Sequence, residues 1–166
     1  GRAGQDHHVA VAAAGDRLLV AAVEVRLPER ERLVVGAAAA HAQMYTMGTL
    51  LRHGSEAQKQ EWLPKIASGE IRLQAFGVTE PTSGTDTTRI QTFAKRVGDK
   101  FIVNGSKIWI SRAEHSDLMV LLCRTSPRDD AGKTSDGMSV LLVDMREAKK
   151  NGLTIKPVRT MLNHAT

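Results

Sequence analysis

The sequence is poor in cysteine, in aromatic residues and in long apolar runs, and each shortage excludes a class of protein. A single cysteine among 166 residues excludes an internal disulfide and a thiolate metal cluster. Cys123 lies in the apolar run 118–123, where a buried, unreactive thiol is favoured over a nucleophile. No apolar run approaches the roughly 18 residues that a membrane span needs. The six histidines lack metal-ligand spacing, and no Gly-x-Gly-x-x-Gly or phosphate-loop pattern is present.

The charge balance is basic but scattered. The net charge is +5, and the lysines and arginines form no run that would indicate a nucleic-acid stripe, so a mixed solvated surface is favoured. The composition suits one soluble globular domain, or one domain and part of another. Gly1 in place of an initiator methionine, and an end at 163–166 without a cap, suggest a fragment. No signal peptide is visible, so the cytoplasm is expected, or the mitochondrial matrix if a transit peptide has been lost.

The first third of the chain divides at about residue 36. Residues 1–36 show neither a helical period nor a motif; we leave them unassigned, with poor order as one interpretation. Residues 37–51 contain good helix formers, and Met44, Met47 and Leu51 recur at spacings of three and four, which places them on one helix face.

A second helix is predicted by its start signal. Ser55, followed three residues later by Gln58, forms a capping-box pattern for a helix over 56–67. Ser68 and Gly69 are expected to end it. Its buried face is expected to comprise Trp62, Leu63 and Ile66.

From Ile71 the pattern changes to β, which predicts an α+β fold with helices followed by a meandering antiparallel β domain. Turn residues occur at 98–100 and at Asn104-Gly105, and the Asn-Gly pair indicates a two-residue hairpin. Segment 125–136 has the composition of an exposed loop. The predicted strands are 72–79, 89–97, 101–103, 106–111, 117–124, 138–143 and 153–156.

One candidate site is the strand-to-loop segment 76–86, which is dense in small and hydroxylic residues. Gly77 would allow a ligand to approach the backbone closely, and Thr79 offers a hydroxyl near the strand end. Residues 83–85 offer backbone N–H donors, so the segment could hold a flat cofactor with polar edges. The alternative is an ordinary turn shaped by proline and bridged by Asp86, which composition alone favours.

A second candidate is the segment 107–111. If it is a strand, Trp109 and Ser111 lie on one face roughly 7 Å apart, a separation that suits a tricyclic ring. The alternative is a core tryptophan beside a surface serine. Glu80 and Asp86 are interpreted as acceptors that brace the loop, although the sequence leaves a general base open.

Both segments resemble the acyl-CoA dehydrogenase family. Residues 77–86 are similar to its signature, a hydrophobic residue followed by Thr-Glu-x-x-small-Gly-Ser/Thr-Asp, and 109–111 to its Trp-hydrophobic-Ser/Thr segment. The flanks 54–70 and 151–155 are also similar, and the resemblance covers 37–166. It implies that 37–70 end an N-terminal helical domain. Residues 71–166 would form most of an antiparallel β-barrel-like middle domain, truncated before a C-terminal helical bundle.

The resemblance also implies FAD as the cofactor. Thr79 should bond the pyrimidine side of the flavin, Trp109 should pack on the isoalloxazine, and Ser111 should lie near the nitrogen that accepts hydride. Thr85 should lie where flavin and acyl-CoA meet, as a substrate-binding residue. The residues carried over for cofactor binding are Phe76, Val78, Thr79, Gly84, Thr85, Trp109, Ile110 and Ser111.

The implied reaction is α,β-dehydrogenation of an acyl-CoA thioester, in which a glutamate base removes the α proton and hydride passes to the flavin. The base is expected beyond Thr166, so the chain alone should be inactive. An electron-transfer flavoprotein is the expected acceptor, the parent is expected to be a homo-oligomer, and no nucleic-acid partner is expected. Two departures are Arg89, where the signature usually has a small residue, and 1–36, which lack the resemblance.

Three alternatives stay open at this stage. An acyl-CoA oxidase would use oxygen on the same scaffold. A non-catalytic or nucleic-acid-associated flavoprotein has only the basic charge in its favour. A truncated product that binds nothing is the third.

Overall fold

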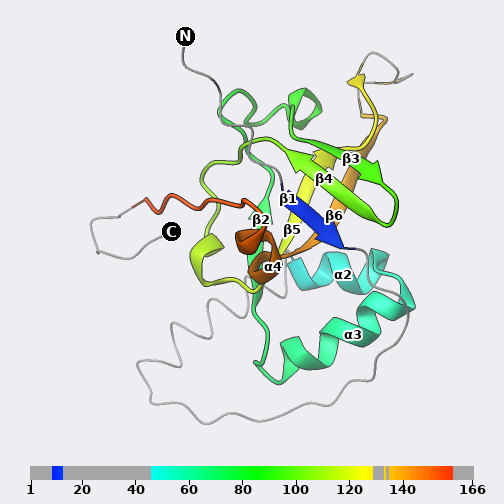
Figure 1. Ribbon diagram of the computed structural model, residues 1–166, viewed down its shortest axis with the longest axis vertical. Coiled ribbons are helices and arrows are strands. Elements are labelled where there is room, and N and C mark those ends of the chain that lie inside the picture. The colour runs from blue at the N-terminus through cyan, green and yellow to red at the C-terminus, as the bar shows by residue number, and fades with distance from the viewer. Residues whose placement is uncertain (1–8, 13–45, 129–132, 134, 159–166) are drawn as a thin grey trace.

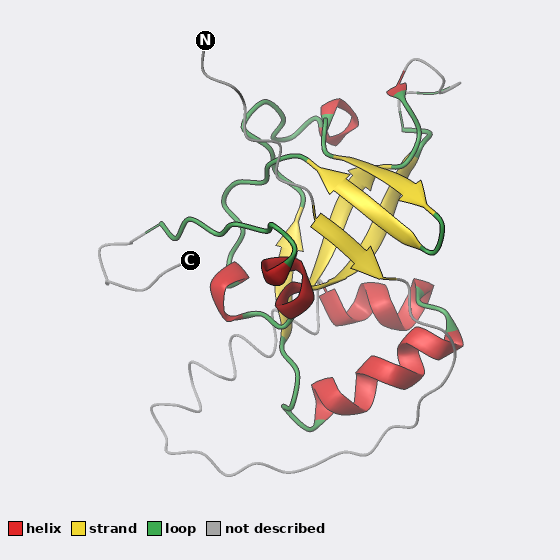
Figure 2. Ribbon diagram, in the orientation of Figure 1, coloured by secondary structure: helices red, strands yellow, loops and turns green. Residues whose placement is uncertain are grey.

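The computed structural model describes residues 9–12, 46–128, 133 and 135–158. Helices α2 (Gly48–His53) and α3 (Glu56–Ala67) lie beneath a twisted sheet, and α4 (Met145–Lys150) lies in front of it, against β1 and β5 (Figures 1 and 2). The predicted order of a helical segment followed by a sheet is confirmed.

The sheet has six strands in the order β1-β4-β3-β5-β2, with β6 also paired to β5. Three pairings of the described strands are antiparallel, but β2 and, at one residue pair, β3 run parallel to β5, so the sheet is mixed rather than wholly antiparallel as predicted. The connection from β2 to β5 contains the β3–β4 hairpin, which lets β5 return in the direction of β2. The strands are β1 Val9–Ala12, β2 Leu73–Gly77, β3 Phe93–Val97, β4 Lys100–Asn104, β5 Leu118–Arg124 and β6 Met138–Asp144.

Strand β5 is the centre of the fold because both of its faces are covered. Leu118 and Val120 pack with the helices α2 and α3, whereas Met119 and Leu121 pack with Met145 of α4. Alternation along the strand sends successive side chains to opposite faces. A strand buried on both faces reads as a continuous apolar run, which is the pattern seen at 118–123.

The irregularity in β2 transfers its side chains from one core to the other. Leu73 belongs to the cluster under the helices, and Ala75 belongs to the cluster on the opposite face. The register of β2 against β5 shifts between these two residues, so both face a core although they are two apart. The Thr46 hydroxyl donates to the Leu73 carbonyl at 2.8 Å and ties α2 to the same strand.

The helix α3 begins where the capping pattern predicts. The Gln58 amide donates to Ser55 Oγ at 3.2 Å, and the Ser55 amide donates to Gln58 Oε1 at 3.0 Å. Leu63 is buried, Trp62 and Ile66 are partly buried against the same core, and Gly69 has a φ of 77° just past the end. The predicted helix, its cap and its buried face are confirmed.

The preceding helix, α2, is present as predicted, but its buried face differs from the predicted one. Leu50 is buried, Met47 packs against the core, and Leu51 is 48% exposed, so the prediction for Leu51 is wrong. Met44 and the rest of the predicted run before residue 46 lie outside the described residues. In the described part, α2 faces the sheet with Leu50.

Two strand predictions and one turn prediction are wrong. Segments 106–111 and 153–156 are irregular, and the β3–β4 hairpin turns at Gly98-Asp99, where Gly98 has a φ of 64°. Asn104 ends β4 without forming a hairpin. Neither β1 nor α4 was predicted. Asp144 caps the first turn of α4 by accepting from two backbone amides.

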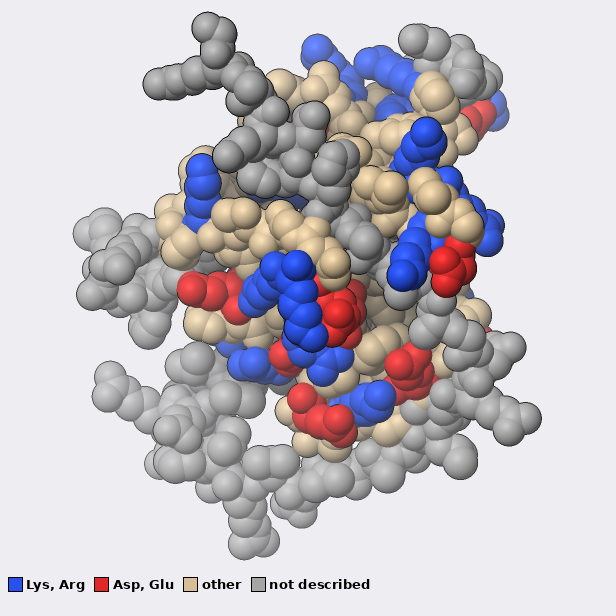
Figure 3. Space-filling view, in the orientation of Figure 1, with Lys and Arg blue, Asp and Glu red and all other residues tan. Residues whose placement is uncertain are grey.

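The described surface intermixes charges. Around α3 and α4, basic and acidic side chains lie next to one another on the visible face (Figure 3). Within the described ranges, no helix is both long enough and apolar enough to cross a membrane. In the same ranges, no group of three acidic, histidine or cysteine side chains could hold a metal ion.

Candidate functional site

The two candidate segments lie against each other in the structure. The Ile108 amide donates to the Thr79 carbonyl at 2.9 Å, and Lys107 Nζ donates to the Val78 carbonyl at 2.8 Å. A further contact joins the Arg112 guanidinium to the Gln74 side chain at 3.1 Å. The segment 107–112 therefore runs beside the end of β2.

Trp109 is presented to solvent on a strained backbone. Its φ is 59°, in the left-handed region that bulky residues rarely adopt, and its side chain is 72% exposed. Such strain costs about 1–3 kcal/mol and clusters at functional sites. An exposed indole held in this conformation is therefore a stronger indication of a binding role than a core tryptophan would be.

The conformation at Trp109 corrects the predicted geometry of this segment. Because 106–111 is not a strand, Trp109 and Ser111 do not share a strand face, and the roughly 7 Å separation that alternation gives does not apply. Ser111 is exposed, like Trp109. Ile110 packs against the core cluster on the sheet, so its side chain anchors the segment.

The end of β2 alternates between core and surface. Ala75 and Gly77 are buried, Phe76 is 37% exposed, and Val78 and Thr79 are half-buried. Side chains of this chain already fill the space beside Gly77, which gives a packing reason for a glycine here. A Cβ at Gly77 would lie 3.1 Å from the side chains of both Leu121 and Met119 and 3.7 Å from Lys107 Cγ.

The loop after β2 closes on itself and leaves its tip free. Glu80 and Ser83 exchange two backbone hydrogen bonds of 2.9 and 3.2 Å, and the Ser83 hydroxyl donates to the Asp86 carbonyl at 2.6 Å. The polar groups of Ser83 are thus used inside the loop. Gly84 and Thr85 are exposed, and no described residue bonds the Gly84 amide or the Thr85 hydroxyl.

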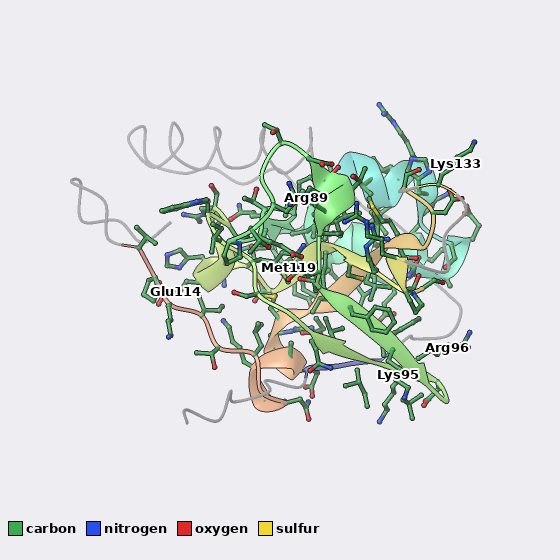
Figure 4. All side chains as sticks on the ribbon, turned by 90° about the horizontal axis from the view of Figure 1, so that it is seen from above. Arg89, Lys95, Arg96, Glu114, Met119 and Lys133 are labelled. Atoms are coloured by element: carbon green, nitrogen blue, oxygen red, sulfur yellow. The ribbon has the colours of Figure 1, made fainter. Side chains whose placement is uncertain are left out.

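Asp86 braces the start of a short 3-10 turn, η2 (Thr87–Arg89). Its carboxylate accepts from the Thr88 hydroxyl and from the Thr88 amide, the latter at 3.1 Å. The Thr88 hydroxyl is the main reason that the pKa of Asp86 is lowered, and nearby Arg89 contributes. The interpretation of Asp86 as a loop-bracing acceptor is confirmed. Arg89 is exposed at the end of η2, apart from Lys95 and Arg96 on the β3–β4 hairpin (Figure 4).

Glu80 is a buried acceptor at the centre of the site. It is 4% exposed, and its carboxylate accepts from Lys107 Nζ at 2.8 Å, the Gln91 amide at 2.6 Å and the Thr92 amide at 3.0 Å. Burial by itself would raise the pKa of Glu80, but the hydrogen bonds, led by that from Lys107, lower it below its usual value. A carboxylate held ionised and fully bonded is poorly suited to take a proton from a substrate. The loop-bracing interpretation is confirmed here too.

Sequence profiles identify the family of this chain. The family described as "Acyl-CoA dehydrogenase, middle domain" matches residues 75–165, more than half of the chain. The chain belongs to the acyl-CoA dehydrogenase family. The profile "Acyl-CoA dehydrogenase, N-terminal domain" matches residues 15–70, so the statement that 1–36 lack the family resemblance is wrong from residue 15 onward.

Relatives and solved structures agree with this acyl-CoA dehydrogenase assignment. Acyl-CoA dehydrogenase FadE29 of Mycobacterium tuberculosis is 44% identical over 63% of this chain and 26% of its own length. The ChsE4-ChsE5 complex of the same organism is 33% identical, with a TM-score of 0.67 over 82% of this chain and 34% of that one. A glutaryl-CoA dehydrogenase of Mycobacterium smegmatis in complex with FADH2 is 35% identical, with a TM-score of 0.50 over 60% of this chain and 23% of that one. The chain spans about a quarter of the length of the curated relatives that it matches first.

Two positions in this acyl-CoA dehydrogenase chain were missed by sequence reasoning. Lys107 is paired with Glu80, and Arg124, which is buried, donates to the carbonyls of Thr88 at 2.6 Å and Ile90 at 3.1 Å. Arg124 therefore holds the η2 turn from beneath. Both residues could have been noticed in the sequence, because each is a cation within or next to an apolar segment. A cation buried in such a place needs a partner.

A cavity of about 480 Å³ lies beside the Trp109 segment. Its walls include Trp109 and Ile110, apolar sheet residues such as Met119 and Leu121, and the segment 152–156. None of the candidate residues between 76 and 85 lines it. The cavity and the exposed loop are therefore different features of the acyl-CoA dehydrogenase chain, and the Trp109 segment borders both.

Proposed function

We propose that this chain is the flavin-holding part of an FAD-dependent enzyme that dehydrogenates acyl-CoA thioesters between the α and β carbons. The observation that carries the proposal is Trp109, exposed on a left-handed backbone and joined to the strand end by the Ile108–Thr79 hydrogen bond. Membership of the family supports the same function, as does the FADH2 bound to the glutaryl-CoA dehydrogenase of similar structure.

The residues present fit a flavin. An isoalloxazine needs an apolar surface and a few polar groups at its edge, and Phe76 and Trp109 are the exposed aromatic side chains of the two segments. Hydroxyl groups are available on Thr79, Thr85 and Ser111. The residues proposed to hold FAD are Phe76, Val78, Thr79, Gly84, Thr85, Trp109, Ile110 and Ser111, with Ile110 acting through its backbone.

Bound FAD would supply a hydride acceptor, and the work of this chain would be to bind and orient it. Trp109 would cover the ring and keep water from it, while Thr79 and Ser111 would donate hydrogen bonds at its polar edge. Thr85, exposed at the loop tip, would reach both the flavin and the acyl-CoA substrate. An electron-transfer flavoprotein is the proposed partner that reoxidises the enzyme.

The two carboxylates of the loop are not proposed as the catalytic base. Glu80 is buried and ion-paired, and Asp86 caps η2. Both have pKa values lowered from their usual ones, which weakens them as bases. The proton-abstracting group of the reaction is therefore assigned outside the 76–86 loop.

A binding measurement tests the proposed function. FAD is titrated into the purified chain and into the Trp109→Ala variant, and the dissociation constant is obtained from flavin fluorescence anisotropy. Loss of the aromatic contact is expected to weaken binding about 2- to 12-fold. Trp62→Phe is the matched control, because Trp62 is on α3, packs against the core under the sheet and has Lys65 over its ring. Equal affinities of the wild type and Trp109→Ala would refute the assignment.

A further inference from the structure

We propose that the buried ion pair of Glu80 and Lys107 is a positioning device that fixes the two flavin-holding segments relative to each other. This inference rests on the proposed function, since it concerns how the flavin site is held. The pair can act without contacting the flavin, because the side chains alone are only 9% exposed for Lys107 and 3% for Glu80.

Lys107 fastens one segment to consecutive residues of the other. Its ammonium group donates to the Val78 carbonyl and to Glu80 Oε1, both at 2.8 Å. The next amide, that of Ile108, donates to the Thr79 carbonyl at 2.9 Å. Two adjacent residues therefore bind three consecutive residues at the end of β2, which fixes both the spacing and the register of the segments.

Glu80 extends the connection to a third segment. Beyond Lys107, its carboxylate accepts from the amides of Gln91 and Thr92, which lie just before β3. The loop tip with Gly84 and Thr85 is thereby closed at its base, because Glu80 is at its start and the two amides follow its end. One buried carboxylate thus holds the loop and the Trp109 segment together.

A buried ion pair is weak evidence for a gain in stability, since desolvation offsets much of the attraction and an apolar pair of similar size often serves as well. Its best-attested use is to enforce one geometry over others. Here the geometry at stake is that of Trp109, which follows Lys107 by two residues on a left-handed backbone. An apolar residue at 107 could fill the same space against Gly77 without holding the Val78 carbonyl.

The test compares Lys107→Met, Lys107→Arg and Glu80→Gln in a Trp62→Phe background, in which Trp109 is the one tryptophan of the chain. Lys59→Met is the matched control, because it removes a lysine from an exposed ion pair of 2.7 Å with Glu56. Two readouts are taken well below the thermal midpoint of each variant. They are the dissociation constant for FAD and the emission maximum of Trp109 without FAD.

Lys107→Met is expected to weaken FAD binding about tenfold, because it removes a side chain that holds the ligand-contacting residues in place. It is also expected to shift the Trp109 emission. Lys107→Arg should restore most of the affinity, and Lys59→Met should change neither readout. If Lys107→Met does not fold, Glu80→Gln carries the test with the same expected direction.

Two results would overturn the proposal. In the first, Lys107→Met has the same FAD affinity and the same Trp109 emission as Lys59→Met. If Glu80→Gln carries the test, the same comparison is made with that variant. The other is a lower thermal midpoint with both readouts unchanged, which would make the pair structural only. A wild-type chain that does not bind FAD would instead refute the proposed function, and the Trp109 emission would still decide whether the pair positions that residue.

Discussion

The amide of Ile108 donates a 2.9 Å hydrogen bond to the carbonyl of Thr79, and this contact joins two segments that are distant in sequence. It places Trp109 directly beside the end of β2, where Phe76 and Thr79 lie. We propose that the aromatic and hydroxyl groups of both segments serve one ligand.

Replacing Trp109 with glycine should separate stability from binding. Glycine adopts a positive φ without strain, which offsets the entropy that it loses on folding. Because the indole is 72% exposed, its removal deletes little packing. The free energy of unfolding in urea is expected to stay within about 1 kcal/mol of the wild type or to rise, while FAD binding weakens. A loss of several kcal/mol would mean that the indole packs against the protein.

Acid should destabilise the chain partly through Glu80. Its folded pKa lies below the usual 4.5, so it contributes stability above that pH and the contribution is lost as the pH falls through the folded pKa. Urea unfolding from pH 7 to 3 should therefore show a steeper loss below about pH 4.5 in the wild type than in Glu80→Gln. Other acids with lowered pKa values, such as Asp117 and Asp144, titrate in both proteins and cancel in the comparison. If the unfolding free energies of the wild type and Glu80→Gln fell in parallel with pH, Glu80 would not be a source of the acid sensitivity.

Removing the cap of α3 should lower stability by a predictable amount. Ser55→Ala deletes the side-chain acceptor for the Gln58 amide and is expected to cost about 1 kcal/mol. Ser135→Ala, at an exposed position, serves as the control and should be neutral within about 0.5 kcal/mol. A neutral Ser55→Ala would show that the capping box does not stabilise α3 in solution.

Cys123 should be unreactive in the folded chain. It is fully buried in β5, and burial raises the pKa of its thiol to about 11. The thiolate is the reactive form, so an aromatic disulfide reagent at pH 8 should label the native chain very slowly and the urea-unfolded chain at once. Rapid labelling under native conditions would indicate that β5 opens readily.

Elements whose signal is local were predictable from the sequence. The Ser55–Gln58 cap, the apolar strand at 118–124 and the buried Cys123 each follow from neighbouring residues, and each is confirmed. The parallel pairing of β2 with β5 was not predictable, because it depends on a long connection rather than on periodicity. The predicted turn at 98–100 does connect β3 to β4, whereas Asn104-Gly105 forms no hairpin because the segment 106–111 after it is not a strand.

The sequence was enough to select the two candidate segments, but not to give their geometry. The family motif identified the segments that contain Thr79 and Trp109, and the structure brings these segments into contact. The prediction assumed a strand, in which Trp109 and Ser111 would point to the same face. The backbone at Trp109 is instead left-handed, a conformation that no local sequence pattern indicated. Lys107 was missed because its partner, Glu80, is distant in sequence. The contact between the two segments and the Glu80–Lys107 pair are tertiary contacts, which local sequence patterns do not indicate.

The central claim is that FAD lies against Trp109, and quenching of tryptophan emission tests it most directly. The chain has two tryptophans, so Trp62→Phe reports on Trp109 alone and Trp109→Phe reports on Trp62 alone. On titration with FAD, the Trp62→Phe chain should show strong, saturable quenching together with a shifted flavin absorption band. The Trp109→Phe chain should show much weaker quenching. Equal quenching of both tryptophans, or none of Trp109, would contradict the account.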